Sequence, residues 1–237
     1  MRARNCMRLF VCLLCVLTHP VLADTPARVQ ASYDVLKAGI RVATITETFT
    51  RTPTEYRIES VSKASGLLAA FKPEIITVTS LGSVTAQGLR PHTFNQLRKL
   101  DPERNTRADL DWDSNSITLT DYGGVRKLPL PVGVQDRLSA MYQFMFLDLQ
   151  HADVLDFYMT NGNKLDTYTY RITPGQSVTV PFGTFKALYV ASPQKAGENR
   201  TEIWLATELD NFPCKMVITD SDGGKLTQVL TQFNSTP

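Results

Sequence analysis

Three aspartates at alternating positions are the first candidates for a chemical site. Asp109, Asp111 and Asp113 would point to one face of a strand, because successive strand side chains alternate between the two faces. A D-x-D-x-D run also opens the calcium loop of an EF-hand, which further requires a turn glycine and a bidentate glutamate. Ser114 occupies the glycine position and Thr120 the glutamate position. We therefore expect a strand with a solvated acidic face that enters a hairpin turn, and no metal site.

Nucleophilic chemistry and zinc binding find little support in the sequence. Cys214, the only cysteine after residue 15, lies in a mostly apolar run at 212–218, which favours a buried structural thiol over a catalytic one. His92 and His151 are far apart and have no partner at metal-ligand spacing. The chain also contains no G-x-S-x-G elbow for a serine nucleophile. We expect neither a zinc site nor a cofactor.

The densest polar cluster, Gln135-Asp136-Arg137-Leu138-Ser139, directly precedes a long apolar segment. In a functional interpretation, a helix N-terminus and Arg137 receive an anionic group of a ligand. In a structural interpretation, Asp136 and Ser139 cap the helix while Arg137 pairs with a carboxylate on a strand. The residue types fit both interpretations, and capping is the commoner use of such residues.

The segments that must position these groups are mostly strands. Between residues 29 and 233, about fifteen short runs rich in Val, Ile, Thr, Tyr and Phe alternate with turn residues. Among the predicted strands are residues 75–81, 93–99, 165–172 and 177–180. Hairpin turns are predicted at residues 37–39, 113–115, 122–124, 161–163 and 222–224.

One long helix is predicted at residues 134–149. Apolar residues recur at helical spacing from Val134 to Leu149, and Asp136 fits a cap or an acid of the first turn. Phe144 and Phe146 widen the apolar surface well beyond one stripe, so the helix must be covered on several sides. A second segment, residues 65–71, is predicted to form a short helix or an apolar bend.

These elements predict an all-β fold. About fifteen meandering strands favour an antiparallel sheet curled into a barrel or half-barrel, because curling removes exposed strand edges. The one apolar helix is expected to pack against this sheet or inside it. The interior of such a barrel is either filled by side chains or able to hold a ligand, and the sequence leaves both outcomes open.

Six short motifs occur in a fixed order along the chain. They are Gly88-Leu89-Arg90-Pro91, Asp111-Trp112-Asp113, Gln135-Asp136-Arg137-Leu138-Ser139, Pro181-Phe182-Gly183-Thr184-Phe185, Trp204-Leu205-Ala206 and Asp222-Gly223-Gly224. As a set they make the chain resemble a family of exported Gram-negative proteins classed as domain of unknown function 3108. Thr207-Glu208 departs from the Pro-Asp that usually follows the fifth motif. The resemblance covers roughly residues 29–233 and implies an exported, β-rich domain with no established activity.

Residues 1–23 have the three parts of a cleavable secretory signal. Three arginines without acids precede an unbroken apolar run at 9–17, and Val21-Leu22-Ala23 forms a cleavage site before Asp24. Nine apolar residues are far fewer than the roughly 20 that a transmembrane helix needs. Two cysteines within the run lie too deep for lipid attachment. We therefore expect release into the periplasm, with no transmembrane anchor after processing.

Removal of the signal changes the charge of the chain. The remaining residues 24–237 contain 22 Lys and Arg against 23 Asp and Glu, and we expect them to form a single β-rich domain. The basic residues are scattered along the sequence, which gives no indication of nucleic acid or of an anionic membrane surface.

These observations favour a non-enzymatic binding or carrier protein of the periplasm. Its expected ligand is an apolar or lipid-like molecule, or a lipidated or other envelope protein partner. The alternatives are a structural or assembly factor of the envelope and a carboxylate-dependent hydrolase. The candidate ligand-binding residues are Arg90, Gln135, Arg137, Met141, Tyr142, Met145 and Trp204.

Overall fold

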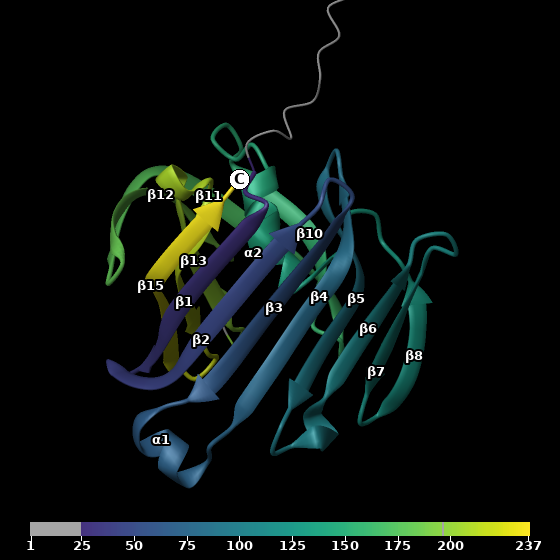
Figure 1. Cartoon of the computed structure of the whole chain (residues 1–237), viewed down its shortest axis with the longest axis horizontal. Coiled ribbons are helices and arrows are strands. Elements are labelled where there is room, and N and C mark those ends of the chain that lie inside the picture. Colours follow the sequence, from purple (N-terminus) through teal and green to yellow (C-terminus); the bar gives the residue numbers. More distant parts are fainter. Residues whose placement is uncertain (1–24, 196) are drawn as a thin grey trace, which may run out of the picture.

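The alternating sequence pattern forms one fifteen-stranded sheet in this computed structural model, which describes residues 25–195 and 197–237 (Figure 1). The first eight strands are β1 (Arg28–Lys37), β2 (Ile40–Arg51), β3 (Glu55–Ala64), β4 (Ile75–Thr85), β5 (Gly88–Arg98), β6 (Thr106–Asp111), β7 (Ser116–Asp121) and β8 (Gly124–Pro129). The others are β9 (Gln135–Asp136), β10 (Val154–Thr160), β11 (Leu165–Val180), β12 (Gly183–Ala191), β13 (Arg200–Ala206), β14 (Phe212–Thr219) and β15 (Lys225–Thr236). The predicted all-β class is confirmed.

The sheet is a continuous meander. Its first and last strands, β1 and β15, pair with each other in the middle of the strand order. Its order runs from β8 back to β1, then to β15 and down to β9, with β1 paired to β15. All pairs are antiparallel except β9 with β10. Within the described residues, β8 and β9 are the two ends of the sheet, which is curled without closing into a barrel. This arrangement confirms the predicted curled sheet in its half-barrel form.

Contacts between the two halves of the sheet hold the curl in place. Gln135 of β9 donates from Nε2 to the carbonyl oxygen of Leu89 in β5, at 2.8 Å. Thr106 of β6 donates to the carbonyl oxygen of Asn161 in the β10–β11 turn, at 2.8 Å. Gly162 in this turn has a φ of 83°, and a Cβ there would lie 2.8 Å from the Thr106 hydroxyl oxygen. The turn therefore fits against β6 only with glycine at this position.

Several strands are longer than the sequence indicates, because turn-type residues lie inside them at irregularities. Gly82 pairs with Pro91 where the register of β4 and β5 shifts, so both strands continue past residues that suggested their ends. Pro174 and Gly175 lie in a similar shift within β11. The predicted strands 165–172 and 177–180 are therefore one strand. The five predicted hairpin turns all fall between consecutive strands.

The predicted helix at residues 134–149 is wrong in extent. The structure has β9, then helix α2 (Ser139–Gln143), a 3-10 turn η2 (Phe144–Phe146), and extended backbone at Leu147. The start of the segment is not helical because the backbone N–H of Arg137 donates to Thr160 of β10.

The apolar residues of this segment pack in two different places, which one straight helix could not serve. Leu138, Tyr142 and Met145 belong to the main core cluster, which includes residues of β1–β7 and of β11–β15, whereas Phe144 and Leu149 belong to a second cluster over β10–β13. The wide apolar surface is thus covered on several sides, as predicted. Of the two alternatives predicted for residues 65–71, a short helix or an apolar bend, the structure has the helix, α1 (Gly66–Phe71). Two 3-10 turns complete the chain, η1 (Pro102–Arg104) and η3 (Thr207–Leu209).

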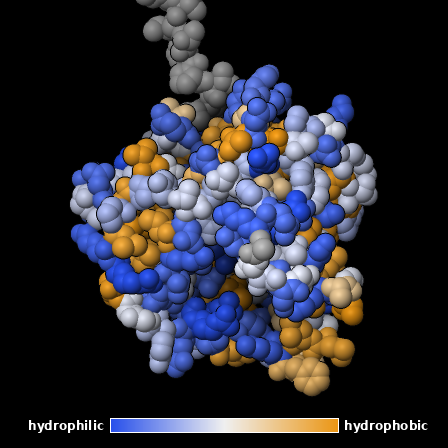
Figure 2. All heavy atoms as spheres, turned by 180° about the vertical axis from the view of Figure 1, so that it is seen from behind, coloured by the Kyte–Doolittle hydropathy of each residue, from blue (hydrophilic) through white to orange (hydrophobic). Residues whose placement is uncertain are grey.

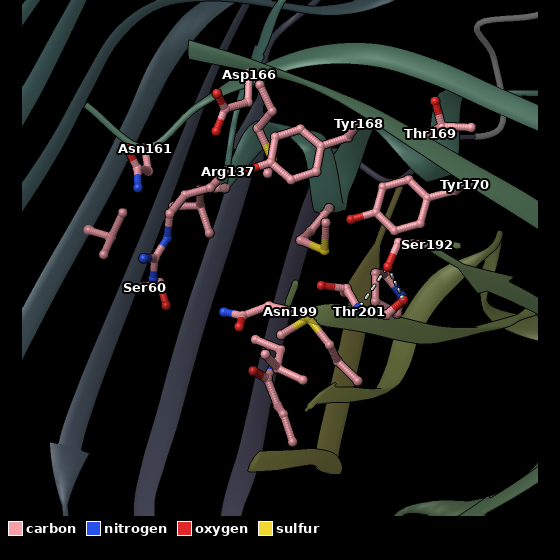
Figure 3. Close-up of a pocket in the computed structure, with 18 of the residues that line it drawn as sticks. Ser60, Arg137, Asn161, Asp166, Tyr168, Thr169, Tyr170, Ser192, Asn199 and Thr201 are labelled. Carbon is pink, nitrogen blue, oxygen red and sulfur yellow. Dashed lines mark hydrogen bonds between the residues drawn. The ribbon is translucent and has the colours of Figure 1, made fainter. Parts of the chain in front are cut away.

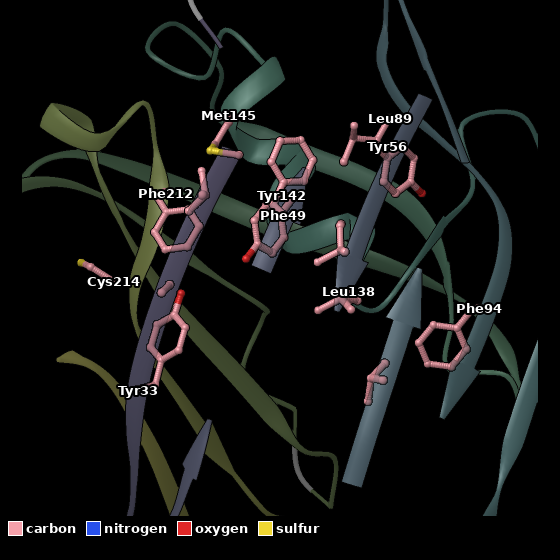
Figure 4. Close-up of a cluster of buried hydrophobic side chains, with 14 of the residues drawn as sticks. Tyr33, Phe49, Tyr56, Leu89, Phe94, Leu138, Tyr142, Met145, Phe212 and Cys214 are labelled. Atoms are coloured by element: carbon pink, nitrogen blue, oxygen red, sulfur yellow. The ribbon is translucent and has the colours of Figure 1, made fainter. Parts of the chain in front are cut away.

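The main core lies at the end of the sheet where α2 packs (Figure 4). Tyr142 stacks on Phe49 with ring centroids 5.1 Å apart and meets Phe212 edge-on at 5.6 Å. Cys214 is buried beside this cluster, and burial raises the pKa of its thiol to about 11. The predicted structural thiol is therefore confirmed as buried, in an environment that opposes thiolate formation.

Residues 1–24 lie outside the described residues, and so does the predicted signal segment. Among the residues that the structure describes, no helix is long and apolar enough to cross a membrane.

Candidate functional site

A cavity of about 1100 Å³ lies inside the curl, on the α1 side of the packed core (Figure 3). Its wall comes from both halves of the sheet, including Glu47 and Ser60 on one side and Tyr168 and Tyr170 on the other. Figure 2 shows the opening as a hollow with a mostly hydrophilic rim on the face opposite to that of Figure 1. This volume is large enough for a small amphiphilic molecule.

The cavity begins where the inward side chains of the sheet change from apolar to polar. Across strands β5 to β2, strand pairing places Phe94, Ser80, Ile58 and Phe49 in one row, and this row packs beneath α2. The next inward row towards α1 is Gln96, Val78, Ser60 and Glu47. The second row contains three polar side chains, and it borders the cavity.

Glu47 is a carboxylate at the inner end of the cavity. Its two oxygens accept hydrogen bonds from the hydroxyls of Ser60 at 3.0 Å and Tyr142 at 3.1 Å. Burial raises the pKa of Glu47, and these two hydrogen bonds, together with the charge of Arg137, partly offset the increase. The side chain is mostly buried, and it lines the cavity.

Arg137 is one of the cationic groups of the cavity, whose wall also includes Lys164, Lys195 and Lys215. Its guanidinium lies deep inside the curl, and the side chain is exposed to the cavity. Its one hydrogen bond to a described residue joins Nη1 to the amide oxygen of Gln96 at 3.1 Å. Burial and the nearby Arg98 lower the pKa of Arg137, while Glu47 and Asp136 raise it. The remaining N–H groups of the guanidinium are available to a molecule in the cavity.

Apolar and sulfur-containing side chains form much of the remaining wall. Met141 of α2, Met159 of β10 and Met216 of β14 approach the cavity from three elements. Such flexible thioethers adapt to ligands of irregular shape. Tyr168 and Tyr170 continue this wall, with parallel rings whose centroids are 6.5 Å apart (Figure 3).

The other carboxylates of the wall have lysine partners. Asp166 pairs with Lys164 at 2.5 Å, and Glu198 pairs with Lys195 at 3.4 Å. Each carboxylate of the cavity, including Glu47, is thus engaged by a cationic or hydroxyl partner. A hydrolase that uses two carboxylates would need one of these contacts to be broken.

Asp136 has a structural position next to the cavity. It is fully buried, and its Oδ1 accepts hydrogen bonds from the backbone N–H groups of Leu138 at 2.9 Å and Ser139 at 2.8 Å. Its Oδ2 accepts a hydrogen bond from Ser80 at 2.5 Å. Asp136 lies in β9, and the N-cap position of α2 is Leu138, so the predicted helix cap is replaced by hydrogen bonds that Asp136 accepts from the backbone just before and at the start of α2. The expected pairing of Arg137 with a strand carboxylate is replaced by the hydrogen bond to the Gln96 amide.

The structure brings two of the seven candidate residues, Arg137 and Met141, to the cavity wall. Tyr142 lies one hydrogen bond behind it through Glu47. Gln135 and Met145 are buried in the packing of the α2 segment.

Arg90 and Trp204 lie away from the cavity. The exposed Arg90 lies over the ring of Trp112, at 4.5 Å from its centroid. Trp204 packs between Tyr189 and Lys215, on the face of β13 opposite to the buried Ile203.

Sequence reasoning missed Glu47, Ser60 and the tyrosines of β11. The signal for Glu47 is present, because the period of two places this acid between Ile45 and Phe49 on the inward face of one strand. An acid at an inward position between two apolar residues indicates a buried network or a site.

The acidic motif at residues 109–113 forms the expected hairpin. Asp109 pairs with Arg107, and Asp111 accepts hydrogen bonds from the backbone N–H groups of Asp113 and Ser114 at 3.1 and 3.0 Å. Within the described part of the chain, no group of three or more His, Cys, Asp or Glu side chains is arranged to hold a metal ion.

Comparison with known proteins assigns the chain to a family. Residues 28–231 match the family model described as "Protein of unknown function (DUF3108)". The chain belongs to this family. No curated protein matches it.

Solved structures support the fold of this DUF3108 protein. The β-barrel-like protein of domain of unknown function DUF1849 from Brucella abortus has a TM-score of 0.56 at 12% identity, over 88% of this chain and 98% of that chain. A protein of Parabacteroides distasonis described as a lipoprotein candidate has a TM-score of 0.38 at 10% identity, over 89% and 96% of the two chains. An exported-protein candidate with a YmcC-like fold from Bacteroides fragilis has a TM-score of 0.35 at 9% identity, over 89% and 97%. The first of these similarities shows a shared β-barrel-like fold.

Proposed function

We propose that this DUF3108 protein is a non-enzymatic binding or carrier protein of the periplasm, and that its cavity holds a lipid-like molecule with an acidic group. The observation that carries the proposal is the position of Arg137. Among the described residues, its guanidinium donates one hydrogen bond, to Gln96, and it lies in a cavity whose wall also includes three methionines. An acidic headgroup would accept hydrogen bonds from the free guanidinium N–H groups. The apolar part of the ligand would lie along Met141, Met159 and Met216.

Glu47 is an acidic group that already interacts with Arg137. It therefore limits how much negative charge a ligand can bring into the site. Its raised pKa reflects the cost of an ionised carboxylate at this depth, and Arg137 offsets part of that cost. A protonated Glu47 would donate a hydrogen bond to the ligand, whereas an ionised one would compete for Arg137. The proposal therefore includes stronger binding of acidic amphiphiles at mildly acidic pH than at alkaline pH.

Displacement of a fluorescent fatty acid tests the proposal. Wild-type protein should bind the probe, and Arg137→Ala should weaken binding by about tenfold, the equivalent of one charge-assisted hydrogen bond. Arg90→Ala is the matched control, since Arg90 lies on the outer surface over Trp112. Equal binding by all three proteins would leave Arg137 without the proposed role. A wild-type protein that binds no lipid probe would refute the carrier function.

Native mass spectrometry of the protein purified from the periplasm identifies the ligand class. A co-purifying mass that fits an acidic amphiphile, and that is lost from Met141→Trp, would support the proposal because the larger side chain occupies part of the cavity beside Arg137. A co-purifying envelope protein bound to an otherwise empty cavity would favour the assembly-factor alternative instead.

A further inference from the structure

The end of the sheet that carries α1 exposes an unusual concentration of apolar side chains. Helix α1 contains no buried residue, and Leu67 and Phe71 are 82% and 86% exposed. We define the apolar tip as the exposed residues Ile40, Leu67, Leu68, Phe71, Leu97 and Leu100. Figure 1 places α1 at the lower edge of the molecule, and Figure 2 shows hydrophobic surface at the lower edge of the face that contains the hollow.

Hydrogen bonds connect the segments that carry the apolar tip. The backbone N–H of Ser65, just before α1, donates to the carbonyl oxygen of Val42 in β2 at 2.9 Å. After α1, Glu74 accepts a hydrogen bond from the backbone N–H of Leu100 at 3.2 Å. These contacts connect the start of β2, helix α1 and the segment after β5. The exposed apolar groups are therefore held together in the fold.

The charges around the apolar tip are mainly positive. The three segments that form it, residues 34–41, 63–74 and 97–104, contain seven Lys and Arg against four Asp and Glu, a net charge of +3. Lys63 and Lys72 flank α1 directly, and both are exposed. This local excess differs from the near-neutral chain as a whole, and the sequence did not indicate it because the three segments are far apart.

We infer that the apolar tip docks on an anionic lipid bilayer, with Leu67 and Phe71 inserted below the headgroups and the surrounding lysines on the lipid phosphates. Exposed leucine and phenylalanine side chains next to lysines are the combination that binds the interface of anionic membranes. The lysine stems extend past the apolar surface while their ammonium groups remain at the headgroup level. A second copy of the chain would bring two positively charged tips together, which charge repulsion opposes.

This inference concerns a different surface from the cavity and does not depend on the cavity's ligand. A protein that binds no fatty-acid probe would still be expected to bind vesicles through α1. If both proposals hold, the tip would place the cavity's rim close to the membrane from which a lipid-like ligand comes.

Flotation of the exported protein with lipid vesicles tests the inference. The wild type should bind vesicles of phosphatidylcholine mixed with phosphatidylglycerol more tightly than vesicles of phosphatidylcholine alone, and salt should weaken this preference. Leu67→Ser combined with Phe71→Ser should lower binding by at least about tenfold, because two large apolar groups no longer insert. Lys63→Gln combined with Lys72→Gln should abolish most of the preference for the anionic vesicles.

Val132→Ser is the matched control, since Val132 is 96% exposed in the loop after β8, at the opposite end of the sheet. It should leave vesicle binding unchanged. A Phe71→Trp variant should show a blue-shifted emission on vesicle binding, which surface adsorption without insertion would not cause. The inference is overturned by a wild type that does not float, or by equal flotation of the Leu67→Ser, Phe71→Ser protein. Concentration-dependent dimers that this double variant abolishes would assign the tip to a second copy of the chain.

Discussion

The two ends of the half-barrel interior are built from the same strands, yet one is filled and the other is hollow. At the α2 end, Phe49, Tyr142 and Phe212 form a closed aromatic core (Figure 4). At the α1 end, the same strands present Glu47 and Ser60 to a cavity of about 1100 Å³ (Figure 3). The sheet itself does not decide which end is filled. The segment after β8 does, because it enters the interior only at the α2 end.

This comparison separates two kinds of inward residue. Residues beneath α2 contribute mainly to the free energy of unfolding, through close packing that admits no water. Residues that face the cavity with accessible surface, such as Glu47, Arg137 and Met141, pack less completely and are free to contact a ligand. The predictions below test this division with pairs of residues that differ mainly in which end they occupy.

Two methionines one helical turn apart should give the largest difference. Met145 is buried in the core, so Met145→Ala should lower the free energy of unfolding by about 2–5 kcal/mol. Met141 lines the cavity, so Met141→Ala should cost less than Met145→Ala, and it should change uptake of a lipid probe. Urea unfolding of both variants measures the difference. Equal costs would mean that the cavity end is packed as tightly as the core.

Asp136→Ala should have the next largest effect. The carboxylate satisfies two backbone N–H groups and the hydroxyl of Ser80, all in the buried interior, and alanine leaves these donors without it. We expect a loss of about 2 kcal/mol or more, because unsatisfied buried donors cost more than a lost surface cap. Asp113→Ala, at an exposed turn position, should change the free energy of unfolding by less than about 0.5 kcal/mol. A small loss for Asp136→Ala would show that water replaces the carboxylate.

Arg137→Ala should change stability by about 1 kcal/mol or less, because solvent in the cavity replaces its hydrogen bond to Gln96. Its expected effect is on probe binding, as proposed above. Chemical unfolding and probe titration of the same preparation separate the two quantities. A large loss of stability without loss of binding would assign Arg137 to the core.

The sequence predicted the β class, the curl and most turns because these depend on local rules. The period of two in the strands and the residues of tight turns are visible over a few positions. The extent of the helix at 134–149 was not predictable in this way. Its spacing was helical, but Arg137 donates its backbone N–H to Thr160, and this contact depends on the placement of β10.

The candidate site was predictable only in part for a related reason. Arg137 and Met141 stood out because they lie in the longer of the two segments that break the strand pattern. Glu47 lies opposite them on β2. The curl of the sheet brings Glu47 close to Arg137, and this long-range proximity cannot be predicted from a short stretch of sequence. Arg90 and Trp204 were plausible by residue type, but strand alternation and local bulges direct them to the outer surface.

The smallest predicted effect is the pH dependence contributed by Glu47. Burial raises the pKa of Glu47 above its ordinary value of 4.5, so the folded protein binds its proton more tightly than the unfolded chain does. This contribution to stability is fully present below pH 4.5 and is lost as the pH rises through the folded-state pKa. Asp136, whose pKa is also raised by burial, contributes with the same sign. Because Glu47 borders a cavity that admits solvent, its share should be the smaller one.

Glu47→Gln isolates this share, because glutamine keeps the shape and, like the protonated carboxyl, has one accepting oxygen and one donating group, but cannot ionise. The variant should be more stable than the wild type at neutral pH, and its stability should decline less between pH 4.5 and neutral. Urea unfolding across this pH range, with the exposed Glu55→Gln as control, measures the difference. A wild type whose stability instead rises through this window relative to Glu47→Gln would mean that Arg137 stabilises the ionised carboxylate more than burial opposes it. The hollow end would then hold a fixed ion pair in place of a site open to an acidic ligand.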